Sequence, residues 1–177
     1  LNQWLFSLVG LESVSGFLEA EQGVQKATLE AFRDRFQLQG ETAGRNAEGV
    51  HFIIQRLLEN VTDEAKLADD ELLEYDRRIQ QHTEAINAGR QAKGLEPIEW
   101  KYFQYLMLLF TEVYLDYLFT KPEALVAGLN EQIERWNAKW IEEENYKHKE
   151  LQAINTEDDL WPQLNLVAYW SATGSGK

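Results

Sequence analysis

The sequence contains no cysteine, only three prolines and one methionine among its 177 residues. The lack of cysteine excludes a disulfide scaffold, thiol catalysis and cysteine-ligated zinc, and it favours a reducing, cytoplasmic location. Since prolines are rare and alternating β-branched runs are few, helices can continue over most of the chain. No uncharged apolar run is long enough to cross a bilayer, so we expect no contact with a membrane.

Basic residues are also scarce: 17 Lys and Arg stand against 30 Asp and Glu, for a net charge of −13. A surface of this sign repels phosphates, so the segment as a whole is not expected to bind nucleic acid. Hydrophobic residues make up 44% of the chain and aromatic residues 12%, enough for the core of one domain of ordinary size. The sequence therefore predicts a mainly α fold, a helical bundle with long antiparallel helices over residues 1–155.

Glycines and polar runs divide this region into expected helices. Residues 1 to about 35 predict two or three short helices, interrupted near Gly10, Gly16 and Gly23. The polar stretch 37–49 predicts a loop, either a lid or, as we favour, a plain linker. The expected helices that follow cover residues 47–60, 62 to Gly89 or Gly94, 99–119, and 120 onward.

The long expected helix after residue 62 carries apolar side chains at alternating spacings of three and four, which predicts a seam against a long partner helix. The seam residues are Ala65, Ala68, Leu72, Tyr75, Ile79, His82 and Ile86. Residues 99–119 are apolar on every face and predict the central core helix. Thr120 and Glu123 have the spacing of a capping box, so the last helix is expected to begin there.

Several side chains in this region could form a catalytic, metal-binding or base-stacking site, but their sequence context favours a structural role for each. Glu112 and Asp116 stand one helical turn apart and fit an acid–base or metal site, but a salt bridge or cap explains them better. Trp136 and Trp140 fit either a base-stacking platform or helical core packing, and their acidic neighbours favour packing. His51, His82 and His148 lack a second ligand at helical spacing, so we interpret them as structural.

The C-terminal residues carry the one motif with specific chemistry. An apolar run from Leu164 to Trp170 predicts a buried parallel strand, and it leads directly into Ser171-Ala172-Thr173-Gly174-Ser175-Gly176-Lys177. In a phosphate-binding loop, glycines let backbone N–H groups converge on a phosphate, and a lysine adds a positive charge. The alternative is an incidental Gly-Ser-Gly linker.

This tail resembles motif I of superfamily-two DEAD/DEAH-box helicases, and it is most similar to the Res subunits of type III restriction enzymes. The resemblance covers about the last 14 residues and implies that residues 156–177 begin an ATP-binding helicase core. Ser171 takes the small-residue position, Gly174 and Gly176 the glycines and Lys177 the phosphate-binding lysine. Thr173 and Ser175 complete the implied nucleotide-binding set.

The family implies ATP and Mg²⁺ as cofactors and ATP-driven movement on DNA, often in restriction or phage defence. The usual upstream glutamine motif that reads adenine is missing; Gln152 or Gln163 are the candidates to replace it. In the family, the magnesium-binding Ser or Thr and the water-activating acidic pair follow the lysine. We therefore expect the chain to be an N-terminal piece of a longer helicase or translocase, and to be inactive by itself.

On this interpretation the helical region is an interaction or regulatory module that contacts a protein partner or its own motor domain. The acidic stretches 69–76 and 142–144 are the surfaces we expect it to use, while DNA would be bound by the motor. The rival interpretation is a free-standing acidic protein–protein interaction module with an incidental tail. An enzyme built on Glu112 and Asp116 ranks below both.

Overall fold

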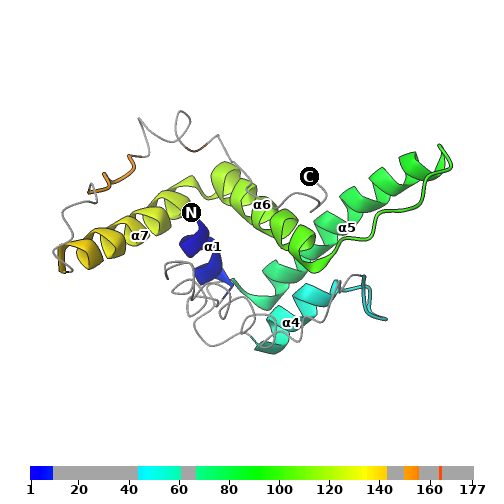
Figure 1. Cartoon of the computed structure of the whole chain (residues 1–177), viewed down its shortest axis with the longest axis horizontal. Coiled ribbons are helices and arrows are strands. Elements are labelled where there is room, and N and C mark those ends of the chain that lie inside the picture. The colour runs from blue at the N-terminus through cyan, green and yellow to red at the C-terminus, as the bar shows by residue number, and fades with distance from the viewer. Residues whose placement is uncertain (10–43, 61–66, 143–149, 156–163, 165–177) are drawn as a thin grey trace, which may run out of the picture.

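The computed structural model describes residues 1–9, 44–60, 67–142, 150–155 and 164. Within these ranges the chain forms a bundle of helices (Figure 1). The helices are α1 (Asn2–Leu8), α4 (Phe52–Asn60), α5 (Asp69–Gln91), α6 (Tyr102–Thr120) and α7 (Pro122–Glu142). The predicted mainly α fold is confirmed. The only described residue of the predicted strand from Leu164 to Trp170 is Leu164, which is helical, so the strand is not confirmed there. The rest of that run and the short helices expected across residues 10–35 lie outside the described residues.

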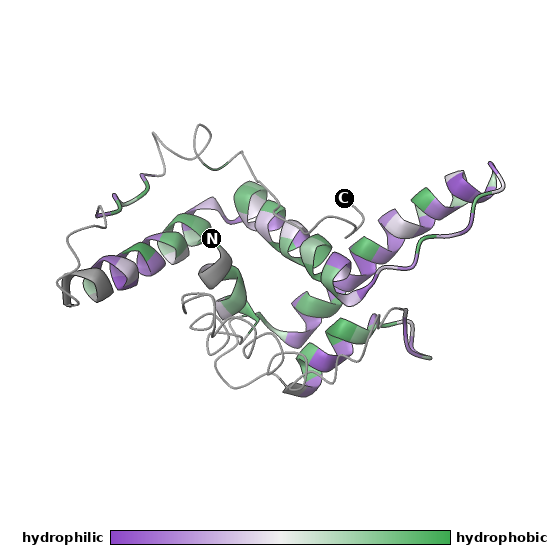
Figure 2. Cartoon of the chain, in the orientation of Figure 1, coloured by the Kyte–Doolittle hydropathy of each residue, from purple (hydrophilic) through white to green (hydrophobic). Residues whose placement is uncertain are grey.

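Helix α6 is the centre of the bundle, as its sequence predicts. It packs against α1, α4, α5 and α7, and most of its residues are apolar (Figure 2). Its fully buried face includes Tyr105, Leu109, Val113, Tyr114 and Leu118. The opposite face is open in part, because Leu115 and Phe119 are 39% and 64% exposed. Helix α6 is therefore central to the bundle but is not buried on every side.

Helix α5 follows the predicted seam for only half of its length. Leu72, Tyr75 and Ile79 are buried against α6, but the side chain of His82 is 74% exposed and Ile86 is 47% exposed. Beyond the crossing with α6, α5 extends away from the core (Figure 1). The expectation of a partner along the whole seam is therefore wrong for its C-terminal part.

Helix α5 ends at Gln91, between the two predicted ends at Gly89 and Gly94. After Gln91 the chain turns through a Schellman motif, in which Leu95 N–H donates to the Arg90 carbonyl and Gly94 N–H donates to the Gln91 carbonyl. Gly94 adopts a φ of +69°, a conformation that costs glycine little and other residues much. The chain then returns along α5 towards α6.

The junction between α6 and α7 differs from its prediction. Thr120 is the last residue of α6, and its hydroxyl donates to the Asp116 carbonyl at 2.7 Å. Pro122 is the first residue of α7, which suits proline because the first helical N–H has no partner to lose. Lys121 therefore stands at the cap position, and the expected capping box of Thr120 with Glu123 is wrong.

A tight turn precedes α4 and shortens it. Asn46 N–H donates to the Val50 carbonyl at 2.9 Å, and Val50 N–H donates back to the Asn46 side chain at 2.9 Å. An isolated antiparallel bridge joins Arg45 to His51. The helix therefore begins at Phe52, five positions after the predicted start, and it buries Ile53, Ile54 and Leu57.

Helix α1 packs the indole of Trp4 against α6 and α7. Trp4 is 2% exposed and meets the Tyr117 ring edge-to-face at 5.2 Å between centroids.

No helix within the described ranges has the length and apolarity needed to span a membrane.

Candidate functional site

The predicted nucleotide-binding residues cannot be placed. Ser171, Thr173, Gly174, Ser175, Gly176 and Lys177 all lie outside the described residues, as does Gln163. Gln152, the other candidate for adenine recognition, is exposed in the extended segment 150–155. The phosphate-binding loop therefore remains a prediction from the sequence.

One described residue does connect this motif to the helical bundle. Leu164, the first residue of the predicted strand, is 8% exposed and belongs to the hydrophobic core. The hydroxyl of Tyr114 on α6 donates a hydrogen bond to the Leu164 carbonyl. Burial raises the pKa of Tyr114, so its hydroxyl keeps the proton that this bond requires. The backbone at Leu164, which is helical in the structure, is thus fixed to the central helix.

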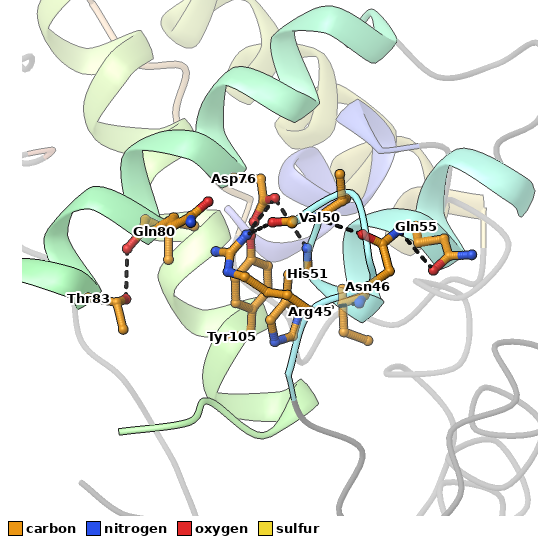
Figure 3. A network of polar contacts seen from close by, with 12 residues as sticks. Arg45, Asn46, Val50, His51, Gln55, Asp76, Gln80, Thr83 and Tyr105 are labelled. Carbon is orange, nitrogen blue, oxygen red and sulfur yellow. Dashed lines mark hydrogen bonds and ion pairs between the residues drawn. The ribbon is translucent and has the colours of Figure 1, made fainter. Parts of the chain in front are cut away.

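The carboxylate of Asp76 is buried among the described residues, at 3% exposure (Figure 3). It accepts hydrogen bonds from Arg45 Nη1 at 2.9 Å, from the His51 backbone N–H at 3.2 Å, and from the Tyr105 hydroxyl. We call Arg45, His51, Asp76 and Tyr105 the Asp76 cluster. It joins the 44–51 turn, α5 and α6, three segments far apart in the sequence.

The hydrogen bonds of His51 define its protonation. Its Nδ1 accepts from the Ile53 backbone N–H at 3.2 Å, so this nitrogen carries no proton. Its Nε2 faces the Trp100 carbonyl at 3.3 Å and is therefore the donor. Burial and, to a smaller extent, the charge of Arg45 lower the pKa of His51 to about 4, against the opposing influence of the Trp100 carbonyl and Asp76. His51 is neutral at physiological pH.

These contacts make the Asp76 cluster a structural site rather than a reactive one. The carboxylate oxygens of Asp76, both ring nitrogens of His51 and the hydroxyl of Tyr105 are occupied by protein partners. Burial and the nearby Asp76 carboxylate also raise the pKa of Tyr105, so its phenol stays protonated. The prediction that His51 is structural is confirmed. The cluster positions the turn over α5 and α6 by compensating the buried carboxylate of Asp76.

Asp76 corrects part of the predicted docking surface. The stretch 69–76 was expected to present an acidic face, and Asp69 and Asp70 are indeed exposed. Asp76 instead points into the core between Leu72 and Ile79. Asp76 lies four residues after Leu72 and three before Ile79, a spacing that places it on the apolar face of the helix. The sequence therefore indicated its burial, but the acidic residues around it suggested an exposed surface.

The predicted carboxylate pair on α6 is divided between separate partners. Asp116 accepts from the Tyr75 hydroxyl at 2.9 Å and from Arg78 Nη1 at 3.1 Å. Glu112 instead lies 3.8 Å from His82. The favoured salt-bridge interpretation is confirmed for Asp116. Among the residues that the structure describes, no group of three or more acidic, histidine or cysteine side chains could hold a metal ion.

The tryptophans of α7 are only partly placed. Trp136 is half-buried, whereas the side chain of Trp140 lies outside the described part of the structure. Core packing of Trp136 and Trp140, which we favour over base stacking, therefore stays a prediction.

Comparisons with known proteins add no relative: no family model, no curated protein and no solved structure matches the chain. The functional argument therefore depends on the chain's own residues.

Proposed function

We propose that residues 1–155 form an N-terminal interaction and regulatory domain of an ATP-dependent DNA helicase or translocase of the restriction or phage-defence type. The observation that carries the proposal is the sequence from Leu164 to Lys177, where an apolar strand-like run leads into a motif I-like loop. A linker would not require such a run. The motor domain begins at about residue 156, and the helical domain precedes it.

In this proposal the loop holds the phosphates of ATP. The backbone N–H groups around Gly174 and Gly176 surround a phosphate, and the Lys177 ammonium offsets its negative charge. When bound, Mg²⁺ would help to offset the negative charge of the phosphates. Family resemblance assigns the magnesium-binding and water-activating groups to residues that follow the lysine, so residues 1–177 alone are expected not to hydrolyse ATP.

The bond between Tyr114 and Leu164 supports a mechanical role for the helical domain. Because the backbone at Leu164 is bonded to α6, a displacement of α6 would be passed towards the loop that begins seven residues further along. A partner that binds the bundle would then alter nucleotide binding through this connection. This is how the helical domain would regulate the motor.

The test is DNA-stimulated ATP hydrolysis by the product of the complete reading frame. Replacing Lys177 with alanine should lower the rate by at least about 100-fold, because the phosphates lose their main protein charge. The matched control is Lys93→Ala, which removes an exposed lysine from the turn after α5 and should leave the rate unchanged. An unchanged rate in Lys177→Ala would disprove the motor proposal.

A second measurement concerns residues 1–177 by themselves. Calorimetric titration with ATP and Mg²⁺ should show no specific binding, because the family's magnesium-binding residues are not among them. Submicromolar affinity would contradict the view that the site is incomplete.

The second candidate function is a free-standing acidic protein–protein interaction module. It is favoured by paired asparagines on α7 that bind an extended backbone, a contact that needs no nucleotide. The reading frame after Lys177 separates the two. A Ser or Thr directly after the lysine and an Asp-Glu pair further on support the motor, whereas unstructured or terminated sequence supports the module.

A further inference from the structure

Two asparagines on α7 hold a second stretch of the chain by its backbone. Asn137 accepts from the Leu151 N–H at 2.9 Å and donates to the Leu151 carbonyl at 2.8 Å. Asn130 accepts from the Ile154 N–H at 2.7 Å and donates to the Ile154 carbonyl at 3.0 Å. We call Asn130 and Asn137 the asparagine pair, and residues 151–154 the strap. The strap runs beside α7 (Figure 1).

The distance between the two asparagines along α7 nearly equals the distance between their two partner residues along an extended chain. Seven residues separate the asparagines along α7, an advance of about 10.5 Å. Three residues separate Leu151 from Ile154, an advance of about 10 Å when extended. The order of the contacts is reversed, so the strap is antiparallel to α7. The asparagine pair therefore presents the donor and acceptor pattern that a neighbouring β-strand would offer to an extended peptide.

The side chains of the strap contribute little to this contact. Leu151 is 48% exposed, and Gln152 and Ala153 are exposed as well. Only the Ile154 side chain packs against the core. Since the hydrogen bonds involve backbone groups that almost every residue possesses, the asparagine pair selects an extended conformation rather than this particular sequence.

We propose that α7 carries a binding surface for an extended peptide segment of a partner protein, and that the strap occupies this surface in cis. The proposal rests on the interaction role given to the helical domain above, and it supplies the surface for it. The partner segment has free N–H and C=O groups on residues three apart, so proline is excluded at both positions, and it has an apolar side chain at the Ile154 position. Binding of the partner displaces the strap.

The test uses the whole chain and a labelled peptide with the sequence of residues 149–157. In the wild-type protein the strap is tethered beside the asparagine pair at an effective concentration in the millimolar range, so it should outcompete the peptide. The double variant Leu151→Pro/Ile154→Pro removes both strap N–H donors and leaves α7 unchanged. This variant should bind the peptide at least about tenfold more tightly than wild type, as measured by fluorescence anisotropy.

Two controls isolate the asparagine pair. Gln152→Pro also places a proline in the strap, but the N–H of Gln152 makes neither of the contacts described, so this variant should bind the peptide as weakly as wild type. Adding Asn130→Ala and Asn137→Ala to the double proline variant should abolish peptide binding. If the double proline variant binds no better than wild type, or if binding survives the loss of both asparagines, the proposal is wrong.

Hydrogen exchange tests the contact without any substitution. The amides of Leu151 and Ile154 should exchange more slowly than those of Gln152 and Ala153, and added peptide at millimolar concentration should remove this protection. Equal exchange at all four positions would contradict the proposal. A wild-type dimer that dissociates in the double proline variant would also overturn it, by showing that the strap of a second copy is the occupant. None of these readouts involves nucleotide, so a failed motor proposal leaves them interpretable.

Discussion

The imidazole ring of His51 stacks on the phenol ring of Tyr105, with 3.6 Å between the centroids and 3° between the planes. The two rings lie at the meeting point of the 44–51 turn and α6. The Tyr105 ring covers one face of the imidazole, and His51 as a whole is buried, which disfavours its charged form. The depressed pKa of His51 is a direct consequence.

This burial predicts a stability that depends on pH. The pKa of His51 is about 4 in the folded protein and near 6.5 when unfolded, so the unfolded chain binds more protons between these values. The free energy of unfolding should therefore be fully maintained above pH 6.5 and fall by about 3 kcal/mol as the pH drops to 4. Urea denaturation at several pH values measures this change.

Glu74 on α5 also makes the stability depend on pH, but in a lower pH range than His51. Hydrogen bonds from Arg77 and Arg78 lower the pKa of Glu74 to about 2, so its stabilisation is lost only below its ordinary pKa of 4.5. The window between pH 6.5 and 4.5 therefore reports His51. In His51→Gln the slope across that window should be reduced, and a slope equal to that of wild type would contradict the assignment. NMR titration of the His51 ring should give a midpoint near pH 4.

Removal of the central carboxylate should be costly. In Asp76→Ala the hydroxyl of Tyr105 and the guanidinium of Arg45 lose their shared acceptor inside the bundle. We expect a loss of about 3 kcal/mol in the free energy of unfolding, since breaking a buried pair leaves its partner uncompensated. Glu84→Gln, an exposed change on the same helix, should alter it by no more than about 0.5 kcal/mol. Similar values for both variants would show that the Asp76 cluster does not stabilise the fold.

Two glycine substitutions should have opposite effects. A Cβ at Gly128 on α7 would lie 2.3 Å from Nε1 and 2.6 Å from Cδ1 of the buried Trp4 indole. Gly128→Ala should therefore displace α1 and destabilise the protein by about 1–3 kcal/mol. Gly89 on α5 has open space around it, so Gly89→Ala should stabilise by about 0.5–1 kcal/mol through helix propensity. Chemical denaturation of both variants measures the difference, and a stabilising Gly128→Ala would contradict the packing of Trp4.

The end of α5 depends on one more asparagine. Asn87 accepts from the Ile98 N–H at 2.6 Å and donates to the Ile98 carbonyl at 3.2 Å, and so holds the returning chain beside the helix. Asn87→Asp keeps the acceptor but loses the donor, and it places a negative charge against a carbonyl. We expect the amide of Ile98 to exchange roughly five- to tenfold faster, for a loss of about 1 kcal/mol. Unchanged exchange would show that the contact is not stabilising.

The sequence determined the local properties of this protein. It predicted the helical class, the central apolar helix and the buried face through Leu72, Tyr75 and Ile79, and it predicted a turn after α5 at Gly89 or Gly94. Each of these depends on periodicity, on backbone conformation or on composition, and those act between near neighbours. The motif from Ser171 to Lys177 is likewise readable from residue order alone, which is why it remains the main argument for the motor.

Only the tertiary structure decided which polar side chains face one another. Asp76 is buried because Arg45 and Tyr105, 31 and 29 positions away, supply its donors. Asn137 and Leu151 meet because the chain reverses after α7 and runs back along it. Periodicity gives the face of a helix to which a residue belongs, but it does not give the partner that compensates the residue there. A buried charge or amide is stable only with that partner, and the partner is set by how the helices pack.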